Sequence, residues 1–279
     1  MKLNKIPTGI KTFDVNINDG FPAGSVILLL EDIGAGAREF LYTSIFNLGQ
    51  MKSDKGFNFK KYKSIDDDSI LTMPDKICYI STSKSLEDIL KETAYAYRKD
   101  FHKYIEEITF KDFSEIYFQN RKDLWISDKK EIREPCCESN KNILDEISGF
   151  LNKNSENNII VIDSLTDLML FETDCLNKDE IIMFLKGMAR ASKTWNGLIY
   201  IILSANILDN KMQEIIKEIV DGVLVFEWYD KGSDKMKRNL YIPKFRGLIT
   251  RLEQNKIAKF ETRVTYDSGF EVSNVKKII

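Results

Sequence analysis

The sequence predicts an α/β fold built on a doubly wound, mainly parallel sheet, with helices on both faces and antiparallel edge strands at the C-terminus. Two patterns predict it. Short apolar runs, typical of buried parallel strands, alternate with stretches of helical apolar spacing from residue 26 to residue 228. Beyond residue 236, strand-like segments are separated by Gly and Asp turns, which favours antiparallel pairing. We expect one domain over residues 1–279, because this length can bury a large core.

Composition excludes several classes of function. Apolar residues make up 43% and charged residues 30% of the chain, and the formal net charge of −2 supplies no overall basic field for nucleic acid. Four cysteines without a C-x-x-C pair and one histidine, His102, lack the usual spacing of a structural zinc site. No apolar run reaches the length of a signal peptide or a membrane span, so we expect a cytoplasmic protein without a membrane partner.

The first buried strand follows a turn-rich segment, residues 6–25, and is expected at Val26–Leu30. Apolar positions then recur at helical spacing from Ala37, and Gly49 is the expected end of this helix. Residues 50–75 are polar and lysine-rich, which predicts a surface insertion.

The next strand is expected at Lys76–Ser81, followed by a helix to about Asp100 that Ser83 or Ser85 can cap. Residues 101–138 combine aromatic side chains with charges of both signs and predict a second surface insertion, with a short strand at Glu115–Phe118. Such aromatics could stack on single-stranded nucleic acid, but packing of the insertion onto the core is the favoured interpretation.

The second half of the chain continues the alternation of strands and helices. Asp163 ends one of these strands, at the edge where ligands bind in open parallel sheets. The expected elements are a helix at 140–152, a strand at 158–163, a helix at 178–194, a strand at 197–203, a helix at 211–219, a strand at 223–228, and C-terminal strands at 237–244, 257–265 and 270–272.

The segment from residue 26 to residue 45 has the layout of a phosphate-binding loop, in which a strand, a glycine turn and a helix N-terminus present N–H groups to an anion. When Gly36 is aligned with the second Gly of the pattern G-x-x-x-x-G-K-[ST], the other fixed positions of the pattern are not matched. Glu31 then replaces the first Gly, Ala37 the Lys, and Arg38 the Ser or Thr. A carboxylate this close to a phosphate costs on the order of 1 kcal/mol.

The order of several motifs along the chain resembles that of KaiC-like proteins, in the RecA/RadA branch of P-loop ATPases. The resemblance covers nearly the whole chain, with residues 50–75 and 101–138 as the diverged parts, and it implies a RecA-like core. The segments that carry it are Thr8–Ile10 with Asp14, Gly20–Ser25, the strand and turn of the loop, Val161–Thr166, and Arg238–Gly247.

This resemblance implies that ATP with magnesium binds between neighbouring subunits of a ring or filament. Asp163 matches the carboxylate that holds magnesium through water, and Lys244 and Arg246 match a segment that reaches a neighbour's phosphates. The candidate cofactor-binding residues are therefore Gly34, Ala35, Gly36, Ala37, Arg38, Asp163, Ser164, Lys244 and Arg246, with Asp163 as the metal ligand.

Three catalytic parts of active relatives are altered. The phosphate-binding Lys and the magnesium-binding hydroxyl are missing, and Ser81–Ser85 holds no carboxylate where active relatives carry the Glu that polarises water. We therefore expect a self-associating regulatory or assembly protein that binds ATP weakly and does not hydrolyse it, with nucleic acid not expected as a partner. A weak ATPase that uses Arg38 or a neighbour's Lys244 is one alternative. A DNA recombination accessory protein is another. A tight turn whose glycines serve geometry alone is an equal interpretation of the loop.

Overall fold

The computed structural model describes residues 3–58, 62–63, 69–114, 116, 143–170, 177–229, 236–245, 248–250 and 257–277. Within these residues, nine strands form one main sheet in the order β12-β11-β10-β9-β3-β8-β7-β5-β6. Its bounds are β3 Ser25–Glu31, β5 Ile77–Ser81, β6 Thr109–Asp112, β7 Ile159–Asp163, β8 Leu198–Ser204, β9 Gly222–Tyr229, β10 Lys237–Phe245, β11 Ile257–Thr265 and β12 Gly269–Lys277.

The strands from β9 to β6 run parallel, and β10, β11 and β12 add to β9 as antiparallel neighbours. The predicted mixed sheet with C-terminal antiparallel edge strands is confirmed. Pro243, which cannot donate to a ladder, falls where the register of β10 on β9 shifts between Tyr241 and Lys244.

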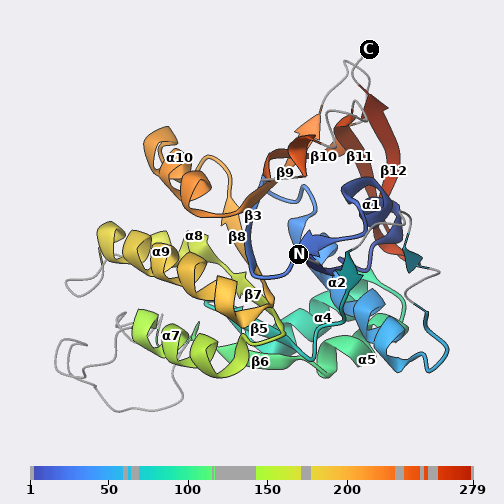
Figure 1. Cartoon of the computed structure of the whole chain (residues 1–279), viewed down its shortest axis with the longest axis horizontal. Coiled ribbons are helices and arrows are strands. Elements are labelled where there is room, and N and C mark those ends of the chain that lie inside the picture. The colour runs from blue at the N-terminus through green and yellow to red at the C-terminus, as the bar shows by residue number, and fades with distance from the viewer. Residues whose placement is uncertain are drawn as a thin grey trace.

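Helices cover both faces of the sheet, as predicted (Figure 1). One face carries α1 Lys11–Asp14, α2 Ala37–Ser53, α4 Leu86–Ala96 and α5 Asp100–Glu106; the other carries α7 Ile143–Asn154, α8 Leu165–Leu170, α9 Lys178–Trp195 and α10 Asn210–Ile219.

Because side chains alternate across a strand, β3 supplies both cores. Ile27 and Leu29 pack under α2, whereas Val26 and Leu28 pack toward the helices of the other face. Burial on both faces explains the unbroken apolar run of this strand.

Most predicted elements differ from the observed ones by one or two residues, but α2 does not end at Gly49. It continues to Ser53, and Tyr104 of α5 packs against Gly49, where a Cβ would lie 2.4 Å from the Tyr104 ring. The glycine thus permits close helix packing in place of ending the helix. Ser85, the second of the two predicted caps, begins α4 in a capping box with Asp88.

The predicted boundary of the second insertion at residue 101 is corrected by the structure. Residues 100–112 form α5 and β6, and β6 extends the main sheet beside β5. Phe101 is fully buried and stacks on Phe46 with 3.9 Å between ring centroids. The strand expected at Glu115–Phe118 lies mostly outside the described residues.

The N-terminal segment forms a second, small sheet in which β1 Asn4–Ile6 pairs with β2 Phe21–Pro22 and with β4 Ile70–Leu71. A short 3-10 helix, η1 Val15–Ile17, follows α1. Within the expected 50–75 insertion, Tyr62 is buried and donates a 2.5 Å hydrogen bond to Asp14. Among the described helices, none combines the length and the apolar character needed to cross a bilayer.

Candidate functional site

The predicted loop joins β3 to α2 and turns at two glycines. Gly34 and Gly36 have φ values of +73° and +117°, in the left-handed region that favours glycine. A side chain at Gly36 would also press on Phe270, since a Cβ there would lie 3.3 Å from its ring. The Ala35 N–H donates to the Asp32 carbonyl at 2.9 Å and closes the turn.

Arg38, on the first turn of α2, bridges two carboxylates. Its Nη2 and Nε donate to Asp163 Oδ1 and Oδ2 at 2.7 and 3.1 Å, and its Nη1 donates to Glu31 Oε1 at 2.6 Å. Burial disfavours the charged guanidinium, but the two carboxylates outweigh this effect and raise the pKa of Arg38. The cation that stands in place of the Ser or Thr is therefore held by two carboxylates of its own subunit, although its side chain is 31% exposed.

Glu31 occupies the position of an anion at this loop. Its side chain is 4% exposed, and its Oε2 accepts the Ala37 N–H at 3.2 Å, a group available to a phosphate in a conventional loop. Burial raises the pKa of Glu31, while Arg38 and the Ala37 N–H act in the opposite direction. The Glu31 carboxylate is therefore engaged by groups of its own subunit.

Asp163 has three donors around its two carboxylate oxygens. Besides the two bonds from Arg38, the hydroxyl of Tyr79 on β5 donates to Oδ2 at 2.6 Å. Burial, followed by the charge of Asp163, raises the pKa of Tyr79 well above its usual value, so this hydroxyl stays a donor. The arrangement does not fit a magnesium ion, because a guanidinium holds both oxygens and no hydroxyl follows Ala37.

The side chains around Asp163 serve local structure. Ser164 caps α8: its Oγ accepts the Asp167 N–H at 3.2 Å and donates to the Asp167 carboxylate at 2.9 Å. Thr82 donates to Asp167 at 2.7 Å and accepts the Ser164 N–H at 3.0 Å. Among the described residues, no three His, Cys, Asp or Glu side chains are grouped so that they could hold a metal ion.

Strand alternation explains why these groups meet. Glu31, Tyr79 and Asp163 each lie two residues after a strand residue whose side chain packs on the α2 face, so they point to the same face. Those preceding residues are Leu29, Ile77 and Val161. Parallel pairing aligns Tyr79 with Val161 and Ser81 with Asp163, which brings the hydroxyl of Tyr79 within reach of the Asp163 carboxylate.

Two residues that the sequence did not indicate hold the loop from the side of β9 and β10. Trp228 donates through Nε1 to the Ile33 carbonyl at 2.9 Å, and Arg238 donates through Nε to the Gly34 carbonyl at 3.1 Å. The Arg238 guanidinium also stacks over the Trp228 ring, 4.4 Å from its centroid. Arg238 lies within the segment that carried the family resemblance, but its role gave no sequence signal.

Lys244 lies away from the loop of its own subunit. Across the sheet, Lys244 on β10 lies opposite Val223 on β9, which lies opposite Leu28 on β3. Leu28 is three residues before Glu31, where the loop begins. Its Nζ donates to the carbonyls of Lys217 and Glu218 at 2.7 and 2.8 Å, at the C-terminal end of α10, where a cation is favourable. Arg246 lies outside the described residues, so its predicted contact with a neighbour's phosphates stays a prediction.

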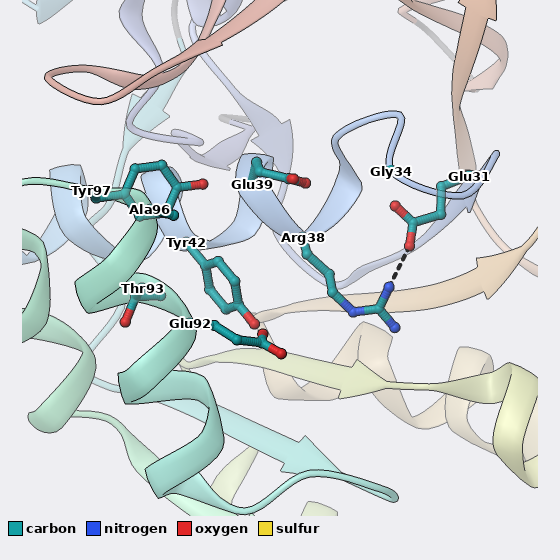
Figure 2. Close-up of a pocket in the computed structure, with 9 residues that line it drawn as sticks. All are labelled: Glu31, Gly34, Arg38, Glu39, Tyr42, Glu92, Thr93, Ala96 and Tyr97. Carbon is teal, nitrogen blue, oxygen red and sulfur yellow. Dashed lines mark hydrogen bonds and ion pairs between the residues drawn. The ribbon is translucent and has the colours of Figure 1, made fainter.

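Beside Arg38, a cavity of about 190 Å³ lies between α2 and α4 (Figure 2). It is smaller than the roughly 300–1,000 Å³ typical of small-molecule sites. Three carboxylates and one guanidinium give the lining a formal charge of −2. The lining residues are Glu31, Gly34, Arg38, Glu39, Tyr42, Glu92, Thr93, Ala96 and Tyr97.

Comparison with known proteins finds solved structures of similar fold. No family model matches the sequence, and no curated protein sequence matches it. Among solved structures, a KaiC-like protein of the hyperthermophilic archaeon Pyrococcus horikoshii OT3 is similar, with a TM-score of 0.62, 18% identity, and coverage of 98% of this chain and 100% of that chain. The flagellar accessory protein FlaH of Methanocaldococcus jannaschii is also similar, with a TM-score of 0.61, 13% identity, and coverage of 94% and 95%.

Both similarities extend over nearly the whole chain, and at these identities they show the fold. The chain therefore has the RecA-like α/β fold of KaiC-like proteins, as its motif order predicted.

Proposed function

We propose that this chain is a KaiC-like protein that does not hydrolyse nucleotides and acts through binding, as a regulatory or assembly protein that associates with copies of itself and with other proteins. The observation that carries the proposal is the position of Arg38, whose guanidinium binds Asp163 and Glu31 together. These contacts occupy the groups that a phosphate and a metal ion would need.

Catalysis of phosphoryl transfer depends on positioned cations and on a group that orients the attacking water. Here the one cation on the first turn of α2 is neutralised by two carboxylates that are each 4% exposed. No Lys or metal-binding hydroxyl stands beside it, because Ala37 precedes Arg38 and Glu39 follows. The loop thus lacks its main electrostatic means of stabilising a transition state.

Binding of ATP would also require the loop to be rearranged. A phosphate at the Ala37 N–H would displace the Glu31 carboxylate, and an ion at Asp163 would displace Arg38. Removing one partner from a buried ion pair costs about 3–5 kcal/mol, and the 31% exposure of Arg38 places the cost here at the lower end of that range. Because this cost would be subtracted from the binding energy, we propose that ATP binds weakly if the loop rearranges to admit it.

An accessory role is the function that remains for a fold whose nucleotide loop is filled by its own side chains. One solved structure of similar architecture belongs to FlaH, which is named as a flagellar accessory protein, and this supports the proposed role. Neither alternative gains support from a described contact. Arg38 and Lys244 are both engaged within the subunit, and the stacked aromatic pairs Phe46–Phe101 and Tyr97–Phe101 are buried and thus closed to nucleic acid.

Release of labelled phosphate from magnesium-ATP by the purified full chain tests the proposal. We expect no turnover above a protein-free blank. Turnover that is lost in Arg38→Ala but kept in Arg263→Ala would overturn the proposal, since Arg263 is an exposed arginine paired with Glu271. Light scattering on the same sample measures self-association, and a strict monomer at all concentrations would contradict that part of the proposal.

A further inference from the structure

The tip of the loop between β3 and α2 presents an apolar side chain to the outside. Ile33 is 88% exposed, although the backbone that carries it is held in place. Its carbonyl accepts a hydrogen bond from Trp228 Nε1 at 2.9 Å, and the next carbonyl, that of Gly34, accepts one from Arg238 Nε at 3.1 Å. A side chain on a restrained turn loses little conformational entropy when it enters an interface.

The residues around Ile33 have the composition of a protein interface. Trp228 and Arg238 are half-buried and stack on each other, and Met236, directly before β10, is 64% exposed. Trp, Met and Arg are enriched in protein interfaces, and Trp and Arg are among the residues that contribute most to binding. We call Asp32, Ile33, Trp228, Met236 and Arg238 the loop patch.

The loop patch carries one charge of each sign. Arg238 bonds to a carbonyl and stacks on Trp228, and the carboxylate of Asp32 accepts the Trp228 N–H at 3.3 Å. Neither Arg238 nor Asp32 forms an ion pair with a residue that the structure describes. They approach Trp228 from opposite sides, because β9 lies between β3, which Asp32 follows, and β10, which carries Arg238.

A patch of this kind is complementary to its own copy. When two copies meet about a two-fold axis, every contact occurs twice, with the roles of the two subunits exchanged. Arg238 of each subunit would then face Asp32 of the other, and the two Ile33 side chains would leave water between these charge pairs. The placement of the charges therefore favours a second copy of this chain as the occupant.

We propose that the loop patch is a two-fold interface between two copies of this chain, with Ile33 at its centre and Arg238 of each subunit paired with Asp32 of the other. The inference rests on the self-association in the proposed function and assigns it to a surface. Because the same patch is used by both subunits, the assembly closes at two copies, whereas a head-to-tail contact would continue into a ring or a filament.

Light scattering of the full chain over a range of concentrations tests the proposal. We expect a dimer for the wild type, and for Ile33→Asp a dissociation constant raised at least about a hundredfold, because the burial of an isoleucine is lost twice. Urea denaturation should show that Ile33→Asp is as stable as the wild type, since the side chain is exposed in the single subunit. Met183→Asp is the control: Met183 is 65% exposed on α9, on the opposite face of the sheet, and this variant should dimerise as the wild type does.

An exchange of charges tests the pairing itself. Arg238→Glu makes both charges of the loop patch negative, and Asp32→Arg makes both positive, so each variant alone should remain monomeric. A mixture of the two variants should form a mixed dimer, because every positive group then faces a negative one. Damage to the fold of either variant could not produce this recovery.

A dimer that is equally tight in the wild type and Ile33→Asp would overturn the proposal, as would a wild-type assembly larger than a dimer. Folded charge variants that stay monomeric when mixed would also overturn it. Self-association that persists in these variants would leave the proposed function intact. A wild type that is monomeric at all concentrations would instead contradict the self-association itself, so the two failures are distinguishable.

Discussion

The guanidinium of Arg38 lies against the carboxylate of Asp163, with Nη2–Oδ1 at 2.7 Å and Nε–Oδ2 at 3.1 Å. This paired geometry matches the two parallel bonds that arginine forms with carboxylates and phosphates. Asp163 ends β7 and Arg38 lies on the first turn of α2, so the contact ties this helix to a strand of the main sheet. In this protein, the Arg38 side chain occupies both oxygens of the carboxylate that the sequence predicts as a metal ligand.

Loss of the Arg38 charge should destabilise the protein. Arg38→Met keeps most of the side-chain volume but leaves Glu31 and Asp163 buried without their cation. We expect the free energy of unfolding to fall by about 3 kcal/mol, measured by urea denaturation. Arg263→Met is the control, because that ion pair is largely exposed and should change stability by less than about 1 kcal/mol. Equal effects of the two substitutions would contradict the role given to Arg38.

The loop should regain anion binding when the pattern is restored. Glu31→Gly removes the internal carboxylate, Ala37→Lys adds the phosphate-binding amine, and Arg38→Thr adds the metal-binding hydroxyl while freeing Asp163. We expect this triple variant to bind magnesium-ATP at least about tenfold more tightly than the wild type by calorimetry, since three electrostatic obstacles are removed. Unchanged affinity in a folded triple variant would show that other features close the site.

Stability should depend on pH through Asp14. Its burial, which outweighs hydrogen bonds from Tyr62, Thr8 and Gly9, raises its pKa from 3.8 to about 6. Because the folded state holds the Asp14 proton more strongly than the unfolded state does, protonation of Asp14 stabilises the fold. This contribution to the free energy of unfolding is complete below about pH 4, decreases as the pH rises, and is lost above about pH 6. The total contribution of Asp14 to the free energy of unfolding is about 3 kcal/mol.

Asp14→Asn should flatten this part of the stability curve, measured by urea denaturation between pH 4 and pH 7. Glu31 also has a raised pKa, but it is present in both proteins and cancels in the difference. The control is Asp145→Asn at an exposed position of α7. A curve of the same slope in Asp14→Asn and the wild type would refute the assignment.

Trp228 should restrain the loop locally. Trp228→Phe removes the bond to the Ile33 carbonyl while keeping an aromatic face for Arg238. We expect about 1 kcal/mol less protection of the amides at 32–36 in hydrogen exchange, with the amides of β7 unchanged. Trp195→Phe on α9 should leave the loop amides as they are. Loop protection that is the same in Trp228→Phe and the wild type would mean that the bond does not restrain the turn.

Much of the fold could be predicted because the relevant signals are local. Apolar runs such as Val26–Leu30 gave the strands, and the antiparallel C-terminal strands followed from their turns. The extension of α2 beyond Gly49 could not be predicted, since it depends on Tyr104, which packs there from a later helix. Likewise, α5 and β6 could not be predicted because their apolar residues are mixed with charges in the sequence, although Phe101 is completely buried.

The sequence located the loop and the carboxylate at the end of a strand, but not the contacts between them. The sequence showed that Arg38 replaced a hydroxyl and that Asp163 ended a strand. It could not show that these two side chains, 125 positions apart in the sequence, are in contact. A flexible guanidinium serves a phosphate or a carboxylate equally well, so only three-dimensional proximity decides between them. The contribution of Tyr79 could have been found from strand alternation, because it lies on the same face as Ile77. That of Trp228 had no comparable signal.

A crystal structure of the full chain grown with millimolar magnesium-ATP tests the central claim most directly. The account predicts that the Arg38 guanidinium stays on Asp163 and Glu31, and that the Glu31 carboxylate stays on the Ala37 N–H. A triphosphate in the loop, with Arg38 turned away from Asp163 and a metal ion in its place, would contradict it.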